Sequence, residues 1–280
     1  MSIVTIKDVK VITTQPAESR LVIVKVNTSE PGLYGLGCAT FTQRFHAVVA
    51  AIEKHMAPFL IGRDVDRIEE IFQMSCVSGY WRNGPVLNNA ISGVDQALWD
   101  IKGKRAGMPV YQLLGGKCRE AAACYAHARG NTKEEILDSI RGYMEQGYQY
   151  IRVQQGSYGG LESTQPRPEG AQDGAYFDPR GYMRAHLDVF EHVREELGFE
   201  IELLHDIHER LAPIHAVHFA KDMERFRLFF LEDALAPEDI DWFRQIRSQC
   251  ATPLAMGELF NHPHEWRALI QERLIDFLRM

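Results

Sequence analysis

Three short apolar runs in this sequence each end in a carboxylate, and the carboxylates are evenly spaced. Asp206, Glu232 and Glu258 follow one another at intervals of 26 residues. That interval fits one strand, one helix and two loops, so it predicts three successive βα units with an acid at the carboxyl end of each parallel strand. The alternative is that each acid caps the helix after its strand.

Three such acids would converge because adjacent parallel strands lie only about 4.8 Å apart. Carboxylates at such a short separation repel one another, and a hard divalent cation removes the repulsion. Oxygen ligands that leave room for water and substrate suit Mg²⁺ better than zinc. The pattern therefore predicts one Mg²⁺ held by Asp206, Glu232 and Glu258.

The composition excludes several classes of partner. The 280 residues are 45% hydrophobic and 25% charged, which is enough for one large α/β domain or two ordinary domains. A net charge of −7 without a basic stripe argues against nucleic acid and anionic membranes. No apolar run approaches the roughly 18 residues that span a bilayer, and the N-terminus has no signal-peptide core, so we expect a cytoplasmic protein.

The cysteines predict neither disulfides nor a thiolate zinc site. They are odd in number, widely scattered and without a CxxC pair. We expect them to be reduced and mostly buried. They are Cys38, Cys76, Cys118, Cys124 and Cys250.

The first part of the chain predicts a small α+β domain. Residues 3–39 alternate as a three-stranded β-meander, and helical patterns follow at 45–62 and 65–77. A further helix is predicted at 89–104, where Gly93 and Ala97, one turn apart, would let a neighbouring backbone approach closely.

Several segments of the sequence resemble those of a known family. SGVDQALWDIKGKRAGMPVYQLLGG is similar to the segment that joins the two domains in the mandelate racemase and muconate-lactonising branch of the enolase superfamily. LLHDIHERLAPI, FFLED and PLAMGELFN resemble the mannonate dehydratase subgroup, also called starvation-sensing protein. The resemblance implies a capping domain, a (β/α)₇β-type barrel, Mg²⁺, dehydration of a sugar acid, and a homo-oligomer.

This resemblance sets the expected fold as α/β, with an N-terminal α+β capping domain at 1–118 and an enolase-type (β/α) barrel at 119–280. Six barrel strands can be placed, at 121–127, 148–155, 201–208, 226–233, 252–258 and 274–280. A closed barrel of this kind has eight strands, and family members continue with a histidine after the seventh and a glutamate after the eighth. We therefore expect a barrel truncated after about six strands, in a fragment or a degenerate protein.

The resemblance also implies a catalytic base. Many relatives carry Lys-x-Lys at the end of the second barrel strand, where this chain has Arg152, so racemase and cycloisomerase chemistry is disfavoured. In the mannonate dehydratase subgroup the base is a tyrosine beside an arginine, which corresponds to Tyr158 and Arg152 here. A guanidinium lowers the pKa of a phenol, which makes the pairing reasonable. This loop reaches Tyr158 sooner than in the efficient mannonate enzymes. Without the resemblance, Arg152 would be read as a surface ion pair and Tyr158 as a turn aromatic.

Three further residues complete the expected site. His208 follows Asp206 by two residues on the same strand face and would donate the proton that expels the 3-hydroxyl as water, or would orient a metal ligand. His205 faces the other way and should pack. By family position, His127 and Thr42 would contact substrate, although the efficient enzymes have asparagine in place of Thr42. The polar segment 161–177 would be a loop that screens water.

These expectations lead to one main prediction of function and two alternatives. The main prediction is Mg²⁺-dependent dehydration of D-mannonate or a close epimer such as D-gluconate to the 2-keto-3-deoxy acid. The alternatives are an acid-sugar racemase or epimerase that uses Tyr158 and His208, and a catalytically impaired protein that binds sugar acids.

Overall fold

The computed structural model describes residues 3–17, 19–41, 43–156, 169–170 and 178–279. The chain divides into two compact units, residues 1–121 and 122–280. The expected boundary at residue 118 lies three residues before this division. Among the described residues, no helix has both the length and the apolar character needed to cross a membrane.

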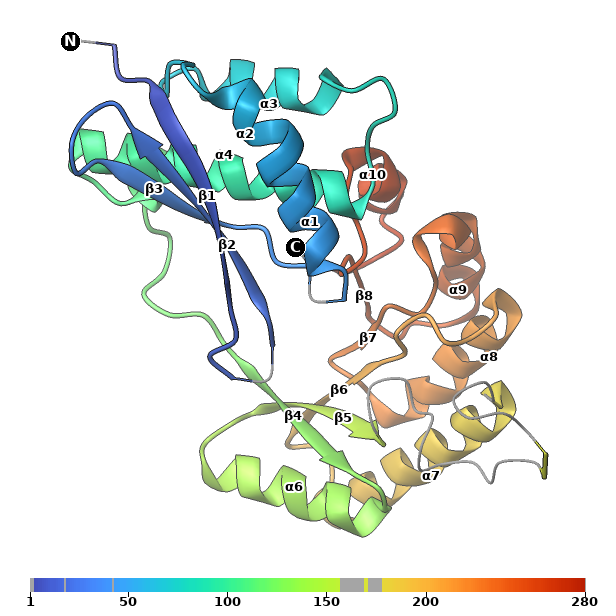
Figure 1. Cartoon of the computed structure of the whole chain (residues 1–280). Helices are drawn as coiled ribbons and strands as arrows, with labels where there is room; N and C mark the ends of the chain where they lie inside the picture. Colours follow the sequence, from blue (N-terminus) through green and yellow to red (C-terminus); the bar gives the residue numbers. More distant parts are fainter. Residues whose placement is uncertain (1–2, 18, 42, 157–168, 171–177, 280) are drawn as a thin grey trace. The chain divides into compact units, whose positions relative to one another are not determined.

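The first unit combines a three-stranded antiparallel sheet with helices (Figure 1). The strands occur in the order β1-β2-β3, as the predicted meander requires, and strand β2 pairs with both neighbours. The elements are β1 (Ile6–Thr14), β2 (Leu21–Thr28), β3 (Tyr34–Cys38), α1 (Phe45–Ala51), η1 (Ile52–Met56), α2 (Ala57–Leu60), α3 (Ile68–Val77), α4 (Pro85–Ala106) and α5 (Val110–Leu113).

Helix α4 packs directly against strand β3 because small residues face each other there. A Cβ added at Gly37 would overlap the backbone of Gly93 and Ala97, and a Cβ at Gly93 would meet the Ala39 side chain. The predicted close approach at Gly93 and Ala97 is thus confirmed. This contact fixes α4 on the sheet, where its apolar residues join the core of the first unit.

The helix predicted at 45–62 is interrupted. Residues Ile52–Met56 form a π-helical turn between α1 and α2. The apolar periodicity places Val48 and Ile52 in the core as predicted, whereas His55, predicted on the same face, is exposed. One extra residue in the turn shifts the register of the helix, and an i, i+3, i+4 pattern does not indicate such a shift.

The second unit is a six-stranded parallel sheet in the order β4-β5-β6-β7-β8-β9, with helices between the strands (Figure 1). All six barrel strands fall within or close to their predicted ranges. The elements are β4 (Tyr125–Gly130), α6 (Lys133–Glu145), β5 (Tyr150–Gln155), α7 (Pro179–Leu197), β6 (Glu202–Asp206), α8 (Pro213–Met223), η2 (Glu224–Phe226), β7 (Phe230–Glu232), η3 (Pro237–Trp242), α9 (Phe243–Gln249), β8 (Leu254–Met256), α10 (Pro263–Gln271) and β9 (Phe277–Leu278).

The core of the second unit lies between the sheet and its helices. Apolar residues of the strands, such as Val153 and Leu203, pack there against Phe190 of α7 and Phe219 of α8. On the opposite face of the same strands lie Leu204, Phe230 and Ala255. The strands are therefore covered by helices on one side, as in a parallel βα arrangement, and carry their polar ends at the carboxyl edge.

The cysteine prediction was partly wrong. Only Cys250 is buried, whereas Cys38, Cys118 and Cys124 are exposed and Cys76 is intermediate. All five thiols are free, as predicted. The three exposed thiols lie at strand ends and in the segment between the units' regular elements, where apolar patterning says little about burial.

Candidate active site

The three predicted acids lie at the carboxyl ends of consecutive strands. Asp206 is the last residue of β6 and Glu232 the last of β7, and the two are register partners in the sheet. Glu258 follows the last residue of β8 by two positions. Asp206 and Glu232 are buried, whereas Glu258 is exposed. The spacing of 26 residues thus corresponds to three successive strand ends, as predicted.

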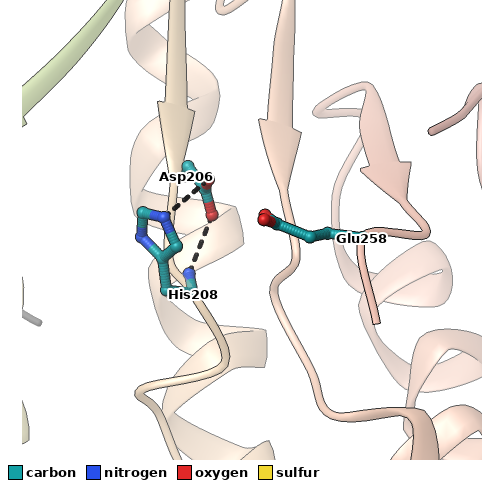
Figure 2. Close-up of side chains that lie close together, drawn as sticks. All are labelled: Asp206, His208 and Glu258. Carbon is teal, nitrogen blue, oxygen red and sulfur yellow. Dashed lines mark hydrogen bonds and ion pairs between the residues drawn. The ribbon is translucent and has the colours of Figure 1, made fainter. Parts of the chain in front are cut away.

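Glu258 connects the acids into two overlapping groups. It lies with Asp206 and His208 in a group whose ligand atoms are all within 4.8 Å of one another. It also belongs to a second such group with Glu232 and Asp233. Figure 2 shows the Glu258 carboxylate pointing toward Asp206 from the turn after β8. The first group offers two carboxylates and an imidazole and the second offers three carboxylates, at a spacing that suits a divalent cation.

A guanidinium also reaches these acids. Arg279 Nη1 lies 2.5 Å from Glu232 Oε1 and 2.7 Å from Glu258 Oε2. The other oxygen, Glu232 Oε2, is buried and has no hydrogen-bond partner among the described residues. A buried carboxylate oxygen without a partner is costly, and a cation on that oxygen removes the cost. The donor set therefore fits Mg²⁺.

Burial and neighbouring carboxylates raise the pKa values of two acids in the site. Burial, and then the charge of Asp206, raises the pKa of Glu232 above its usual value. The same two causes, with Glu232 added, raise the pKa of Asp233 to about 8. A bound divalent cation would stabilise the charged forms and lower both pKa values.

Arg152 is buried beside Asp206. Its side chain on β5 is 5% exposed, and Arg152 Nη1 donates to Asp206 Oδ2 over 2.7 Å. Its Nη2 donates to Gln154 Oε1 over 3.3 Å. The simple alternative of a surface ion pair is therefore wrong. A guanidinium that donates to a buried carboxylate is held in one orientation and presents a fixed positive charge.

His208 reaches Asp206 by a turn of the backbone. Strand β6 ends at Asp206, and His208 has a φ of +53°. Its backbone N–H donates to Asp206 Oδ1 over 2.9 Å, and its ring Nε2 lies 3.0 Å from Asp206 Oδ2 (Figure 2). The two side chains are close, as predicted, but a left-handed turn brings them together instead of strand alternation.

His127 lies on β4, beside Arg152 in the register of the sheet. It is half-buried and stacks on Tyr125, with ring centroids 5.3 Å apart. Burial, followed by the charge of Arg152, lowers the pKa of His127 to about 4. At neutral pH this ring is uncharged, so it can accept or donate one hydrogen bond without adding charge.

Other expected residues lie outside the described part of the chain. They are Thr42, Tyr158 and most of the loop at 161–177.

Sequence reasoning missed two residues of this site. Gln154 lies between Arg152 and His208, with its Nε2 3.4 Å from His208 Nδ1. Arg279 follows β9 and bridges Glu232 and Glu258. The alternation of β5 gave a signal for Gln154, because it shares a strand face with Arg152. A pocket of about 420 Å³ also borders Glu258 and Arg279.

The chain matches two family models that together cover most of its length. Residues 3–115 match the N-terminal domain of mandelate racemase / muconate lactonizing enzyme. Residues 135–280 match the enolase C-terminal domain-like family. The predicted superfamily and branch are therefore confirmed.

Curated relatives agree with the family models. A D-galactonate dehydratase family member, RspA of Pantoea ananatis, is 54% identical over 296 residues, covering 100% of this chain and 71% of its own length. A D-galactonate dehydratase family member of Musicola paradisiaca is 53% identical, with the same coverage. The narrower assignment to the mannonate dehydratase subgroup stays a prediction.

Solved structures extend the comparison. A crystal structure of an enolase from Pantoea ananatis, with bound D-gluconate and Mg, has a TM-score of 0.93 and 54% identity, covering 99% of this chain and 71% of that one. A putative dehydratase from Zymomonas mobilis has a TM-score of 0.83 at 26% identity, covering 99% of this chain and 73% of that one. The Pantoea ananatis structure holds an ion of the predicted kind, and the acidic groups around Glu258 form a candidate metal-binding site in this chain. This chain belongs to the mandelate racemase and muconate lactonizing enzyme branch of the enolase superfamily, and within it to the D-galactonate dehydratase family.

Proposed function

We propose that this chain carries out the Mg²⁺-dependent dehydration of a sugar acid to the 2-keto-3-deoxy acid through an enediolate. The substrate is D-mannonate or a close epimer such as D-gluconate. The observation that carries the proposal is the grouping of the Glu258 carboxylate with acids from both preceding strands. The family membership and the D-gluconate and Mg bound in the Pantoea ananatis structure support it.

Negative charge is the main barrier in this reaction. Removing the C2 proton of a sugar acid places two negative charges on neighbouring oxygens of the former carboxylate. A bound Mg²⁺, held by Asp206, Glu232 and Glu258, would neutralise part of that charge. Arg152 and Arg279, which already donate to these acids, add fixed positive charge beside them.

The base is proposed from the family resemblance. Tyr158 would act as the phenolate, which the Arg152 guanidinium would stabilise, and would become the neutral phenol when it takes the C2 proton. Arg152 suits this task because it is buried and held by two hydrogen bonds, to Asp206 and Gln154. A fixed cation needs no reorganisation when the charge on the phenol changes.

The acid in the proposal is His208. Its ring lies against Asp206, and an imidazole can carry a proton near neutral pH. His208 would give that proton to the 3-hydroxyl as it leaves as water. His127 would contact the substrate as a neutral hydrogen-bonding group, and Thr42 would contact it from the capping domain.

A cytoplasmic location and a homo-oligomer also stay predictions.

A panel of hexonates tests this function. Purified protein with Mg²⁺ should convert D-mannonate or D-gluconate to a 2-keto-3-deoxy acid, measured as a semicarbazone and by NMR. Deuterium uptake at C2 in D₂O without loss of water would instead indicate an epimerase. Thermal stabilisation by a hexonate without any product would indicate a binding protein, and either result would overturn the proposal.

A further inference from the structure

Behind the candidate site, on the helix side of the sheet, three polar side chains are completely enclosed. They are Tyr182 and His186 on helix α7 and His205 on strand β6, with exposures of 2%, 0% and 0%. Phe190 and Phe219 surround the His205 ring, with centroids 5.6 Å and 5.8 Å away. Polar groups in such surroundings are costly unless each finds a hydrogen-bond partner, so their contacts need an explanation.

The hydrogen bonds of His205 show which ring nitrogen carries the proton. His205 Nδ1 lies 2.9 Å from the carbonyl oxygen of Val153, which can only accept, so Nδ1 carries the proton and donates. An imidazole that carries its one proton on Nδ1 has Nε2 as an acceptor. The Tyr182 hydroxyl, 2.8 Å from Nε2, therefore donates to it.

This chain of bonds runs from a helix through one strand to the next. The paired register of β5 and β6 ends at Arg152 and Leu204. One residue further along each strand, the His205 side chain links β6 to the Val153 carbonyl of β5. Successive residues of a strand face opposite sides, so Arg152 and Asp206 project from the other side of the sheet at this same level.

We propose that Tyr182 and His205 form a positioning pair that holds the carboxyl ends of β5 and β6 at the separation the site requires. Tyr182 fixes the His205 ring, and the ring fixes Val153, which lies between Arg152 and Gln154 in the chain. On the other side of β6 the backbone itself continues the link, because Ile207 N–H donates to the Glu232 carbonyl over 3.0 Å. The pair supplies the corresponding support toward β5.

The consequence is that the pair orients the candidate metal ligand Asp206 from the helix side of the sheet. A shift of β5 against β6 would change the 2.7 Å contact between Arg152 Nη1 and Asp206 Oδ2 and with it the direction of the Asp206 carboxylate. Loss of partners that orient metal ligands typically weakens metal binding by 10-fold to 100-fold. The inference rests on the proposed function for its catalytic meaning but not for its geometry.

The test compares three variants with a matched control. Tyr182→Phe removes only the hydroxyl. His205→Asn keeps a donor at the position of Nδ1, whereas His205→Leu has none. Tyr143→Phe is the control, because Tyr143 is a half-buried tyrosine of α6 that packs on the same core. Near-ultraviolet circular dichroism establishes that each variant is folded.

Three readouts decide the proposal. Calorimetric titration with MgCl₂ should show about 10-fold weaker binding for Tyr182→Phe and for His205→Asn, which both lose the bond between Tyr182 and residue 205, at least as large a loss for His205→Leu, which also loses the bond to Val153, and near wild-type binding for Tyr143→Phe. With a hexonate substrate, kcat should fall in the same order while KM changes less. A double-mutant cycle between Tyr182→Phe and Asp206→Asn, measured by urea unfolding, should show coupling even without metal.

The outcomes separate this inference from the proposed function. If wild-type protein binds Mg²⁺ but turns over no hexonate, the dehydratase proposal fails while the order of Mg²⁺ affinities still tests the pair. If the protein binds no Mg²⁺, the coupling between Tyr182 and Asp206 decides. Folded Tyr182→Phe and His205→Leu proteins with wild-type Mg²⁺ affinity, or a cycle without coupling, would overturn the positioning role.

Discussion

Arg152 Nη1 and Asp206 Oδ2 lie 2.7 Å apart with both side chains buried, Arg152 within strand β5 and Asp206 at the carboxyl end of the adjacent parallel strand β6. Burying either charge there without the other would destabilise the folded state. The pair therefore links the stability of the second unit to the electrostatics of its candidate metal site, and this link can be measured.

Removing the guanidinium should destabilise the protein in a metal-dependent way. In Arg152→Met the Asp206 carboxylate loses its buried countercharge, so the free energy of unfolding should fall by about 3 kcal/mol. Added Mg²⁺ should restore part of that loss, because a cation on Asp206 replaces the missing charge. Urea unfolding at roughly 25 °C, without Mg²⁺ and with Mg²⁺ at about 10 times its Kd, measures both the loss and the recovery.

A matched control is Arg141→Met. Arg141 pairs with Glu196 at the surface, and both side chains are nearly half exposed. Its removal should cost less than about 1 kcal/mol, with no effect of Mg²⁺. Equal losses for the two variants, or a loss in Arg152→Met that Mg²⁺ does not change, would show that Arg152 does not compensate Asp206.

The role of His208 as the acid can be separated from a role in orienting a metal ligand. His208→Gln should slow dehydration by about 10²-fold to 10⁴-fold, because no group then protonates the leaving hydroxyl. Exchange of the C2 proton with D₂O, which needs only the base, should continue. NMR follows both reactions in one sample. A parallel loss of exchange and dehydration would mean that His208 acts through the metal ligands, and His215→Gln on α8 serves as the control.

The buried histidines should make the protein sensitive to acid. Burial lowers the pKa of His186 to about 4, whereas the unfolded chain binds the proton near pH 6.5. Between these values only the unfolded state is protonated, so stability falls as the pH falls from about 6.5 to about 4 and does not depend on this group at higher pH. The expected loss from His186 between pH 6.5 and pH 5 is about 2 kcal/mol.

His186→Phe should remove that part of the pH dependence. Urea unfolding at several pH values gives the slope, which should decrease by about one proton relative to the wild type. His264→Gln, which changes an exposed histidine of α10, should leave the slope unchanged. A His186→Phe protein with the wild-type slope would show that His186 is protonated in the folded state.

Two glycines should respond in opposite directions to the same substitution. Gly37→Ala would force a Cβ into the backbone of helix α4, so the first unit should lose about 3 kcal/mol or unfold. Gly142 lies in helix α6 with nothing within 4 Å of its missing Cβ, so Gly142→Ala should gain up to about 1 kcal/mol. Thermal unfolding measures both, and a well-tolerated Gly37→Ala would contradict the observed packing of α4 on β3.

The fold was largely predictable because its signals are local and repeated. Strands β6, β7 and β8 each lie in an apolar run, and the acids Asp206, Glu232 and Glu258 end those runs at the period of a βα unit. Parallel pairing then brings the strand ends together without further information. The glycine and alanine pair in α4 likewise predicted a close contact that depends only on side-chain size.

The rest of the site depends on geometry that one-dimensional patterns do not contain. His208 lies beside Asp206 through a residue with positive φ, and strand alternation gives the right neighbour for the wrong reason. Arg279 gains its contacts to Glu232 and Glu258 from other strands, which the spacing of its own segment does not indicate. The partner of His205 on α7, Tyr182, is likewise fixed only by the packing of that helix.

Magnesium binding by the wild type and three single variants tests the central claim most directly. Calorimetric titration should show one Mg²⁺ per chain for the wild type, and at least 10-fold weaker binding for each of Asp206→Asn, Glu232→Gln and Glu258→Gln, since each removes a charged oxygen ligand. Wild-type affinity in any one of the three folded variants would contradict a single ion shared by the acids of three consecutive strands.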